Sequence, residues 1–507
     1  MREFGARFWA GTLSACLALG GCASLPRHVD KFPSTALRHP ENTKLGRIVA
    51  DSGGGGELSG IRLLSSGAEA FDSLIALTDR AERTLDLQYY IIDEDESSRI
   101  LLQHVRMAAE RGVRVRILVD DLNTTGQDPR FMRLGELPNI EVRVFNPFPS
   151  GRFALWSRFL FSAYHIWRIN HRMHNKLFVA DNAIAITGGR NIGDQYFTRD
   201  RTYNFVDLDV IAAGKIVPEL SASFDTFWNS KYAYPIASFA AAVPMEPEPD
   251  LADAGTGVNK ADFLARELDA GKLKLDWVPA TVLADRPVKI ASETSPAEEE
   301  TIANNIAALM RSARKDVTII SPYFIPGKKG VALMHRLVDR GVHIRILTNS
   351  LATTDAPLVD IGYSRYRVPL LKLGVELREL RPKLGVARPR FHPFRYSTAS
   401  LHAKALVIDD DTVFIGSLNM DARSAHTNTE LGIVFRSPQI AKQVTALFDD
   451  ISTYGSYRLQ LIDHSKQIEW LSGVPGSERI WYHEPDTTLW ERLLLKMLTP
   501  FAPEELL

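Results

Sequence analysis

The sequence predicts an α/β protein in which one folding unit occurs twice along the chain. The clearest sign is a repeated segment: residues 111–118 return as residues 340–347, and each copy precedes a pair of threonines. A second sign is the order of elements, because a buried strand, a helical segment and another strand follow one another in both copies. The length of 507 residues and the hydrophobic share of 45% suffice for two sizeable cores.

The amino terminus resembles the signal peptide of a bacterial lipoprotein. Two arginines precede an apolar stretch over residues 8–19, which is too short to span a bilayer comfortably. Residues 19–22 read LGGC and resemble a lipobox, so we expect residues 1–21 to be removed and Cys22 to carry lipid. Ala23 favours a protein that faces the periplasm from the outer membrane. The alternatives are the inner membrane and an uncleaved anchor.

The rest of the chain divides into two large and three small segments. Residues 22–58 contain little periodic structure and four consecutive glycines, which predicts a flexible tether. The first α/β domain is expected over residues 59–240, and a linker rich in alanine and proline over residues 241–260. The second domain is expected over residues 261–460, followed by a carboxyl-terminal extension over residues 461–507.

Each predicted domain contains a strand, a helix and a second strand in that order. The first strands cover residues 85–91 and 317–325, and both consist largely of apolar and aromatic residues. The helices lie near residues 98–111 and 328–340. Strands joined in this way pair in parallel through right-handed crossovers, so each half is expected to form a sandwich on a mixed sheet.

The carboxyl-terminal extension carries an apolar stripe at helical spacing. Its members are Trp490, Leu493, Leu494, Met497 and Leu498. Such a stripe either packs against a core or lies on a membrane surface, and the sequence leaves both open.

Charge balance and cysteine content exclude several classes of protein. The formal net charge of -1 excludes a polycation that holds nucleic acid by net charge alone. The only cysteines are Cys16 and Cys22, so the body has no thiol for metal binding or catalysis. Residues 151–176 and 381–404 are basic, partly aromatic and free of acid. They suit an anionic lipid surface or single-stranded nucleic acid, unless the aromatics are core and the charges solvated.

A short motif gives the strongest functional signal, because it occurs twice in register with the longer repeat. It places a histidine, a lysine and an aspartate at one spacing in both halves: His174, Lys176 and Asp181, then His402, Lys404 and Asp409. Residues two apart in a strand share a face, so each histidine points the same way as its lysine. Each aspartate lies seven residues after its histidine, an odd number that places it on the opposite face of a strand. The aspartates are therefore expected to stabilise the motif rather than touch substrate.

These residue types suit the transfer of a phosphodiester group. Neutral imidazole can attack phosphorus, and imidazolium can protonate the departing alkoxide. The lysines can offset the charge of the phosphate oxygens, and Asn191 and Asn419 can donate to the same oxygens. Each half supplies one histidine and one lysine, so we expect one site between the halves, with no metal and no cofactor.

Together these features resemble the phospholipase D superfamily with its two HKD motifs. With their flanking segments, over residues 171–194 and 400–424, they are most similar to bacterial cardiolipin synthases of the type C group, from about residue 60 to the end. The resemblance implies two tandem phospholipase D-type α-β-α sandwich domains related by a pseudo-twofold axis, with a single active site at their interface. One departure is Gly189, where the family usually carries the serine found as Ser417 in the second copy.

The resemblance also implies roles for the site residues. His174 is expected to be the nucleophile and to form a phosphatidyl-histidine intermediate. His402 is expected to be the general acid and then the base, although the residues alone leave the order of the two open. A downstream carboxylate should orient each histidine, and the candidates are Asp207, 33 residues after His174, and Glu430, 28 residues after His402.

The predicted activity is that of a cardiolipin synthase, a transphosphatidylase that uses phosphatidylglycerol with a second phospholipid. The second lipid is phosphatidylglycerol or phosphatidylethanolamine. Hydrolysis of phospholipids to phosphatidic acid is the main alternative, followed by a nucleic-acid phosphodiesterase and a lipid-binding protein without activity. The expected partner is an anionic phospholipid membrane, with no nucleic acid, and the need for a protein partner is left open.

Overall fold

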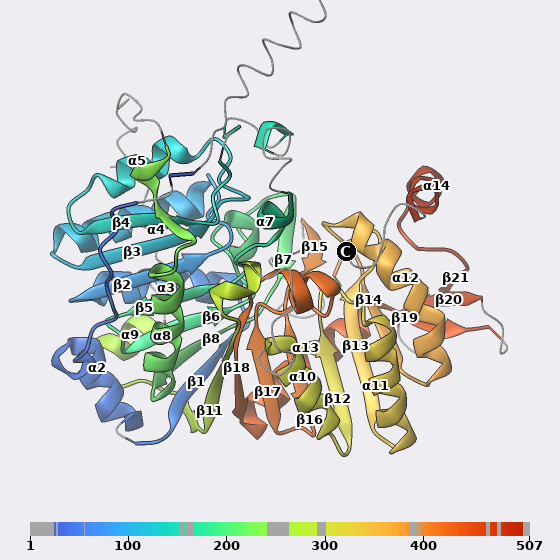
Figure 1. Cartoon of the computed structure of the whole chain (residues 1–507). Helices are drawn as coiled ribbons and strands as arrows, with labels where there is room; N and C mark the ends of the chain where they lie inside the picture. The colour runs from blue at the N-terminus through green and yellow to red at the C-terminus, as the bar shows by residue number, and fades with distance from the viewer. Residues whose placement is uncertain are drawn as a thin grey trace, which may run out of the picture.

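Two α/β units lie side by side in the computed structural model of this chain (Figure 1). The structure describes residues 25–26, 29–54, 56–149, 151–152, 156–158, 166–240, 263–291, 301–384, 394, 397–462, 467–473 and 478–499. The predicted signal peptide over residues 1–21, the lipidation site Cys22 and the linker over residues 241–260 lie outside the described residues.

The first unit is built on a nine-stranded sheet in the order β10-β1-β8-β6-β5-β2-β3-β4-β9. The strands are β1 (Ser59–Leu64), β2 (Thr84–Tyr89), β3 (Arg114–Asp120), β4 (Ile140–Phe145), β5 (Leu177–Ala180), β6 (Ile184–Gly188), β8 (Asp209–Gly214), β9 (Ala233–Pro235) and β10 (Asp276–Val278). The helices are α2 (Lys44–Val49), α3 (Gly67–Arg80), α4 (Glu96–Glu110), α5 (Asp128–Gly135), α7 (Ile166–Asn170), α8 (Ile216–Trp228) and α9 (Phe263–Asp269).

The second unit repeats this plan on a ten-stranded sheet in the order β11-β18-β17-β16-β12-β13-β14-β19-β20-β21. The strands are β11 (Ala280–Ala284), β12 (Asp316–Ile320), β13 (His343–Asn349), β14 (Glu376–Leu380), β16 (Ala405–Ile408), β17 (Thr412–Gly416), β18 (Leu431–Arg436), β19 (Ser456–Leu461), β20 (Ile468–Ser472) and β21 (Arg479–Trp481). The helices are α10 (Ile302–Arg311), α11 (Gly327–Asp339), α12 (Pro357–Lys372), α13 (Pro438–Tyr454) and α14 (Leu489–Leu498).

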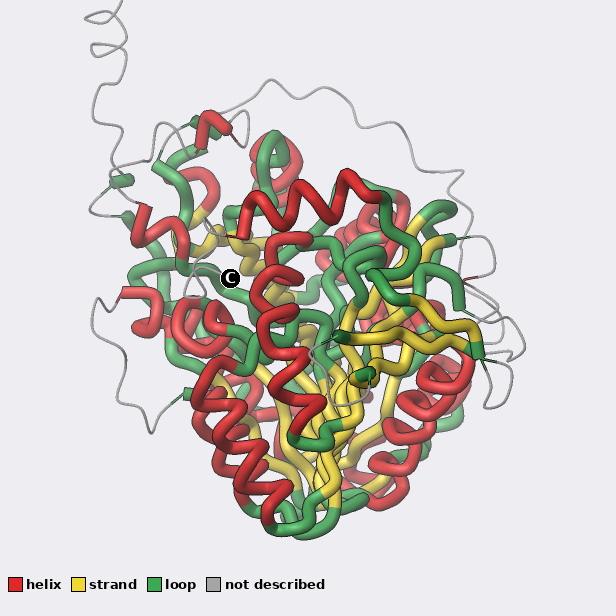
Figure 2. The backbone as a smooth tube through the Cα atoms, turned by 90° about the vertical axis from the view of Figure 1, so that its right-hand side faces the viewer, coloured by secondary structure: helices red, strands yellow, loops and turns green. Residues whose placement is uncertain are grey.

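The predicted strand–helix–strand order is confirmed in both units. Strands β2, β3 and β4 pair in parallel, and so do β12, β13 and β14. The connecting helices α4 and α11 begin and end within two residues of the predicted bounds. Figure 2 shows helices on both sides of the strands, which confirms the predicted α-β-α sandwich.

A small third sheet and a shared core join the units. Strand β7 (Tyr203–Val206) of the first unit pairs in parallel with β15 (Thr398–Leu401) of the second. One buried cluster contains residues of both units, such as Val206 and Phe224 with Ala399 and Val407. The junction is therefore part of the folded core, and it can fix side chains from the two units against each other.

The prediction of a flexible tether over residues 22–58 is wrong for residues 40–54. Short helical turns cover residues 40–54, with α2 at their centre. Leu45, Ile48 and Val49 are buried in the core of the first unit, and the Thr43 side chain caps the helix. Three apolar residues at i, i+3 and i+4 make a helix face, but six residues are too few for a periodic signal.

The predicted domain boundaries also differ from the structure. Helix α9 and strand β10, assigned to the second domain, belong to the first: β10 pairs with β1, and Leu264 and Leu268 join the first core. Part of the carboxyl-terminal extension is a continuation of the second sheet, because β20 pairs with β19 and β21 pairs with β20. Short edge strands give weak patterns in a sequence, and only pairing assigns them to a sheet.

Candidate active site

Each HKD motif is held at the junction by the backbone of the other unit. His174 lies shortly before β5, and its backbone N–H donates to the carbonyl of Thr429 in the second unit (3.0 Å). His402 lies shortly before β16, and its backbone N–H donates to the carbonyl of Val206 in the first unit (2.9 Å). This reciprocal docking brings the two motifs together at the interface between the units.

Each histidine ring pairs with a carboxylate of the opposite unit. His174 Nδ1 lies 2.9 Å from Glu430 Oε2, and His402 Nδ1 lies 2.6 Å from Asp207 Oδ2. All four side chains are buried. The structure thus places both predicted carboxylates against the histidines, but it crosses the pairs: Asp207, which follows His174 in the chain, serves His402. With both Nδ1 atoms engaged, the Nε2 atoms are left for chemistry.

Two buried lysines complete the positive side of the site. Lys176 Nζ donates to the His174 carbonyl (2.7 Å), and Lys404 Nζ donates to the His402 carbonyl. Burial lowers the pKa of Lys404 to about 8 and that of Lys176 well below its usual range. Each lysine donates to a backbone carbonyl, and Lys176 Nζ also lies 5.4 Å from the centre of the Tyr90 ring. A phosphate anion between them would favour their charged forms and offset the cost of their desolvation.

The carboxylate behind His174 is shared with two hydroxyls. Ser417 Oγ donates to Glu430 Oε2 (2.5 Å), and Ser424 Oγ donates to Glu430 Oε1 (2.8 Å). Burial raises the pKa of Glu430 to about 7. Its negative charge is therefore weakly held, and it stabilises a positive charge on His174 correspondingly little.

The carboxylate behind His402 has a different environment. Gly189 stands where the second unit has Ser417, and a Cβ at Gly189 would lie 2.1 Å from Asp207 Oδ1. Burial favours the neutral acid, but the charge and hydrogen bond of His402, together with Lys404, bring the pKa of Asp207 down to about 2. The departure from the family pattern at Gly189 is what makes room for this carboxylate.

The histidines themselves are desolvated and face positive neighbours. Burial and the two lysines lower the pKa of His174 well below its usual range. Burial and Lys404 lower the pKa of His402 to about 4, against the opposing pull of Asp207. A phosphodiester anion between the lysines would raise both pKa values by offsetting their charge.

The two asparagines predicted to contact phosphate differ in their partners. Asn191 Oδ1 accepts from the Ile91 N–H (3.2 Å), and its Nδ2 donates to the Tyr196 hydroxyl (3.0 Å). Asn419 Oδ1 is buried without a hydrogen bond to any described residue. Tyr196 lies edge-on to His402, with 5.2 Å between ring centres. Asn191 therefore fixes an aromatic wall of the site, and phosphate contact by both amides stays a prediction.

Asp181 and Asp409, the third members of the motifs, do not reach the site. They follow β5 and β16 at the ends remote from the histidines. Asp181 accepts the N–H groups of residues 82–84 before β2, and Asp409 accepts those of residues 314–316 before β12. Both adopt positive φ, 53° in each case. Their carboxylates thus hold the starts of β2 and β12 in place and lie away from the histidines, in agreement with the predicted stabilising role.

Sequence reasoning missed a pair of residues that position the motifs. Asp120, the last residue of β3, accepts from the Met173 N–H through Oδ2 (2.9 Å). Asn349, the last residue of β13, accepts from the Leu401 N–H (2.8 Å) and donates to its carbonyl (2.9 Å). Each anchors the residue immediately before a site histidine. The two lie in register in the repeated segments, so the same repeat that revealed the motifs could have revealed them.

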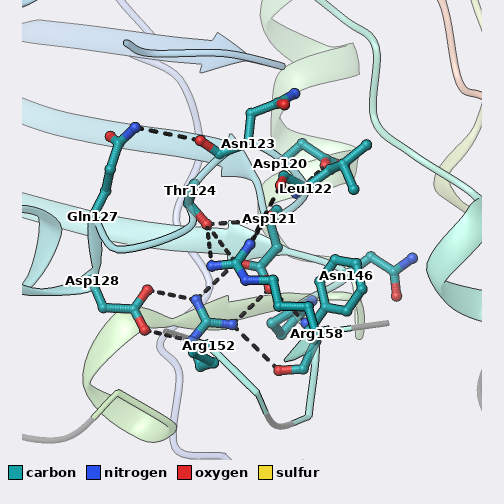
Figure 3. A network of polar contacts seen from close by, with 12 residues as sticks. Asp120, Asp121, Leu122, Asn123, Thr124, Gln127, Asp128, Asn146, Arg152 and Arg158 are labelled. Atoms are coloured by element: carbon teal, nitrogen blue, oxygen red, sulfur yellow. Dashed lines mark hydrogen bonds and ion pairs between the residues drawn. The ribbon is translucent and has the colours of Figure 1, made fainter. Parts of the chain in front are cut away.

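Among the described residues of the first basic stretch, which exclude 153–155 and 159–165, three arginines belong to ion pairs with acids of another segment: Arg152, Arg158 and Arg172. Figure 3 shows Arg152 bound to the carboxylate of Asp121, at 2.6 Å for the closest pair of atoms. Arg172 pairs with Asp120 at 3.2 Å. The expected excess of positive charge is therefore wrong at Arg152 and Arg172, because acids from another segment neutralise them. Residues 385–393 of the second stretch lie outside the described residues.

The arrangement can accept a phosphodiester, attack it with one imidazole and protonate its leaving group with the other. Within the described residues, no group of three or more histidine, cysteine, aspartate or glutamate side chains is placed to hold a metal ion. Two repeated α/β units that share one His–Lys site define an enzyme of the phospholipase D type.

Comparison with known proteins gives the family. The family described as "Cardiolipin synthase, PLD-like domain" matches residues 74–228 and 306–452. The chain is 38% identical to cardiolipin synthase C of Escherichia coli K12, over 88% of this chain and 96% of the relative. It is 26% identical to cardiolipin synthase 1 of Bacillus anthracis, over 84% of this chain and 71% of the relative. The chain belongs to the cardiolipin synthase family of phospholipase D-like proteins and is a phosphatidyltransferase.

A solved structure supports the fold. The phosphatidylserine synthase of Haemophilus influenzae Rd KW20 superposes with a TM-score of 0.57 at 15% identity, over 92% of this chain and the whole of that chain. At this identity the likeness shows the two-domain fold alone.

Proposed function

We propose that the protein is a cardiolipin synthase that uses phosphatidylglycerol with a second phospholipid: the phosphatidyl group of phosphatidylglycerol or phosphatidylethanolamine passes through a phosphatidyl-histidine intermediate to a hydroxyl of phosphatidylglycerol. The observation that carries this proposal is the pair of crossed His–carboxylate contacts, at 2.9 Å and 2.6 Å, with two buried lysines beside them. The family and the named relatives supply the class of substrate.

In the first step, His174 Nε2 attacks phosphorus and forms an N–P bond. The P–O bond to the glycerol headgroup breaks, and His402 Nε2 gives its proton to the departing alkoxide. Lys176 and Lys404 offset the charge that develops on the non-bridging oxygens. Glycerol leaves with the proton, and the phosphatidyl group stays on His174.

In the second step, a hydroxyl of a second phosphatidylglycerol occupies the place of the leaving group. His402, now neutral, takes the hydroxyl proton while the oxygen attacks phosphorus. The N–P bond breaks, cardiolipin is released, and both histidines return to their first state. With phosphatidylethanolamine as donor, the same steps release ethanolamine.

The carboxylates support this division of roles. Asp207 keeps its full negative charge and favours a protonated His402, as a general acid requires. Burial raises the pKa of Glu430 to about 7, so it holds its charge weakly and leaves His174 neutral, as a nucleophile requires.

The test uses purified full-length protein and labelled phosphatidylglycerol, with and without phosphatidylethanolamine. We expect cardiolipin with released glycerol or ethanolamine, and none from His174→Ala. In His402→Asn, a phosphatidyl ester with a nitrophenol leaving group, which needs no general acid, should leave its acyl-lipid label on His174, where mass spectrometry can find it. Label on residue 402 in a His174→Asn protein would reverse the roles. Phosphatidic acid as the sole product would identify a phospholipase D instead.

The proposal also includes the attachment of the enzyme to a membrane. A lipid on Cys22 would hold the enzyme at a membrane facing the periplasm, next to its substrates, in the outer or the inner membrane. Radiolabelled palmitate should enter the wild-type chain and not Cys22→Ser. Fractionation of the two membranes then decides between them.

A further inference from the structure

The carboxyl-terminal helix α14 presents a continuous apolar face to solvent. Its exposed members lie at i, i+1, i+4, i+5 and i+8, and their exposed fractions are 62% for Leu489, 78% for Trp490, 41% for Leu493, 54% for Leu494 and 64% for Met497. Of the two interpretations of this stripe, the structure therefore supports core packing only for Leu498, which contacts the second core. Large apolar side chains grouped in this way mark an interaction surface.

The exposed face is not needed to hold the helix in place. Leu495 and Leu498 on its other side pack against the core of the second unit. Arg365 of α12 donates to the Thr499 carbonyl (3.1 Å) at the end of the helix. Thr488 and Glu491 form a capping box at its start. The helix is thus fixed to the enzyme by one side and offers the other outward.

The charges and aromatics around the face match an anionic lipid surface. Lys496 adds an exposed positive charge to α14, whereas Arg492 donates to the carbonyls of Glu484 and Thr487, and the single acid of the helix, Glu491, is occupied in the capping box. Trp490 and the 61% exposed Tyr482 are side chains that prefer the boundary between lipid and water. Among the described residues, no helix is both long and apolar enough to cross a bilayer. Helix α14 has ten residues and one apolar face, which suits contact in the plane of a membrane surface.

The position of α14 relative to the site agrees with this role. In Figure 1, α14 lies on the upper side of the second unit, and β7 of the first unit and β15 of the second lie in the upper part of the junction, where they lead to Asp207 and His402. The histidines are buried, with exposed fractions of 8% and 6%, so a headgroup must be delivered to them from a lipid surface.

We infer that α14 is an interfacial helix that docks the enzyme on anionic phospholipid, with its apolar face in the headgroup boundary and Lys496 at the phosphates. The inference rests on the proposed phospholipid substrate. It adds a membrane contact that is separate from the amino-terminal lipid and from the catalytic residues.

A local probe tests the contact independently of catalysis. In full-length protein with Cys16→Ser and Cys22→Ser, Leu494→Cys provides the only thiol for an environment-sensitive fluorophore. Vesicles of phosphatidylcholine with phosphatidylglycerol should raise its emission about twofold or more, and phosphatidylcholine alone should do less. The same label at Lys442→Cys, an exposed site on α13, should not respond.

Three results would overturn the inference. One is unchanged emission from position 494 with both kinds of vesicle. Another is an equal response at position 442, which would mean that the whole protein adheres without a specific face. The third is a rise that follows protein concentration without vesicles, which would identify a second copy of the chain as the occupant.

A matched activity assay then shows what the contact does. Leu493→Glu with Met497→Glu should slow headgroup exchange on vesicles at least about tenfold, because two apolar side chains no longer enter the lipid. Exchange on substrate dispersed in detergent should be unchanged. Phe263→Glu, at a 67% exposed apolar residue of the first unit, is the control and should not affect either rate. Equal loss in both assays contradicts docking, whereas absence of exchange in the wild type rejects the proposed function and leaves the fluorophore result standing.

Discussion

The two halves of the site share one scaffold and differ in charge. In both, a β-strand end anchors the residue before the histidine, and a carboxylate from the opposite unit holds Nδ1. The carboxylate behind His174 also accepts two serine hydroxyls, whereas the one behind His402 faces Gly189 and keeps a full charge. A duplicated unit can thus place identical residues in two different electrostatic environments by changing what surrounds their partners.

The largest difference should come from removing the two carboxylate charges in turn. Asp207→Asn should lower kcat by about a thousandfold, because His402 loses the charge that favours its protonated form. Glu430→Gln should lower kcat by only about thirtyfold, since its charge is already weakly held. A substrate with a nitrophenol leaving group needs no acid and should restore most of the rate of Asp207→Asn but not of Glu430→Gln. Equal losses, or equal rescue, would contradict the division of roles.

Gly189 and Ser417 occupy equivalent positions beside the two carboxylates. Exchanging one for the other tests whether the space and the hydrogen bond at this position set the difference between the two halves. Gly189→Ser places a Cβ within 2.1 Å of Asp207 Oδ1 and should displace that carboxylate, with a loss of about a hundredfold in kcat. Ser417→Gly removes one hydrogen bond to Glu430 and should cost about tenfold. Steady-state kinetics on proteins with unchanged circular dichroism measure both effects. A larger loss in Ser417→Gly would reverse the comparison.

The pKa of Lys404 predicts that the activity of the enzyme falls at alkaline pH. Lys404 has a pKa of about 8, so it is charged below this pH and loses its proton as the pH rises through it. The value of kcat/KM should therefore fall above pH 8, by about tenfold at pH 9, because the phosphate loses one of its cations. A profile that stays flat to pH 10 would show that Lys404 keeps its charge or does not bind phosphate.

The smallest effect is expected at the positioning residues. Asp120→Asn makes the first half like the second, which has Asn349, and it keeps an acceptor for the Met173 N–H. It leaves the buried Arg172 unpaired, so the free energy of unfolding should fall by about 3 kcal/mol. We expect kcat to fall about fivefold at unchanged KM, through a slight misplacement of His174. Asp181→Asn is the control: it should lower stability without changing kcat.

The pattern of apolar residues along the sequence was sufficient to predict much of the fold. The repeated segment and the period of the apolar residues predict β2, α4, β3 and their counterparts, because long elements must bury one face and show it in the sequence. The sequence did not predict the helical turns over residues 40–54, helix α9 or the edge strands β20 and β21. Each of these elements is short and belongs to a core or a sheet built by residues far away in the chain.

The chain by itself determined the chemistry: two histidines and two lysines at one spacing, in register with a repeat, and no thiol in the body. Only the tertiary structure decided how they are used. It crossed the carboxylates between the units, neutralised Arg152 and Arg172 with Asp121 and Asp120, moved Asp181 and Asp409 away from the site, and left one face of α14 outside the core. The reason is physical: residue type follows from the needs of the reaction, whereas charge, protonation and exposure depend on neighbours that only folding brings together.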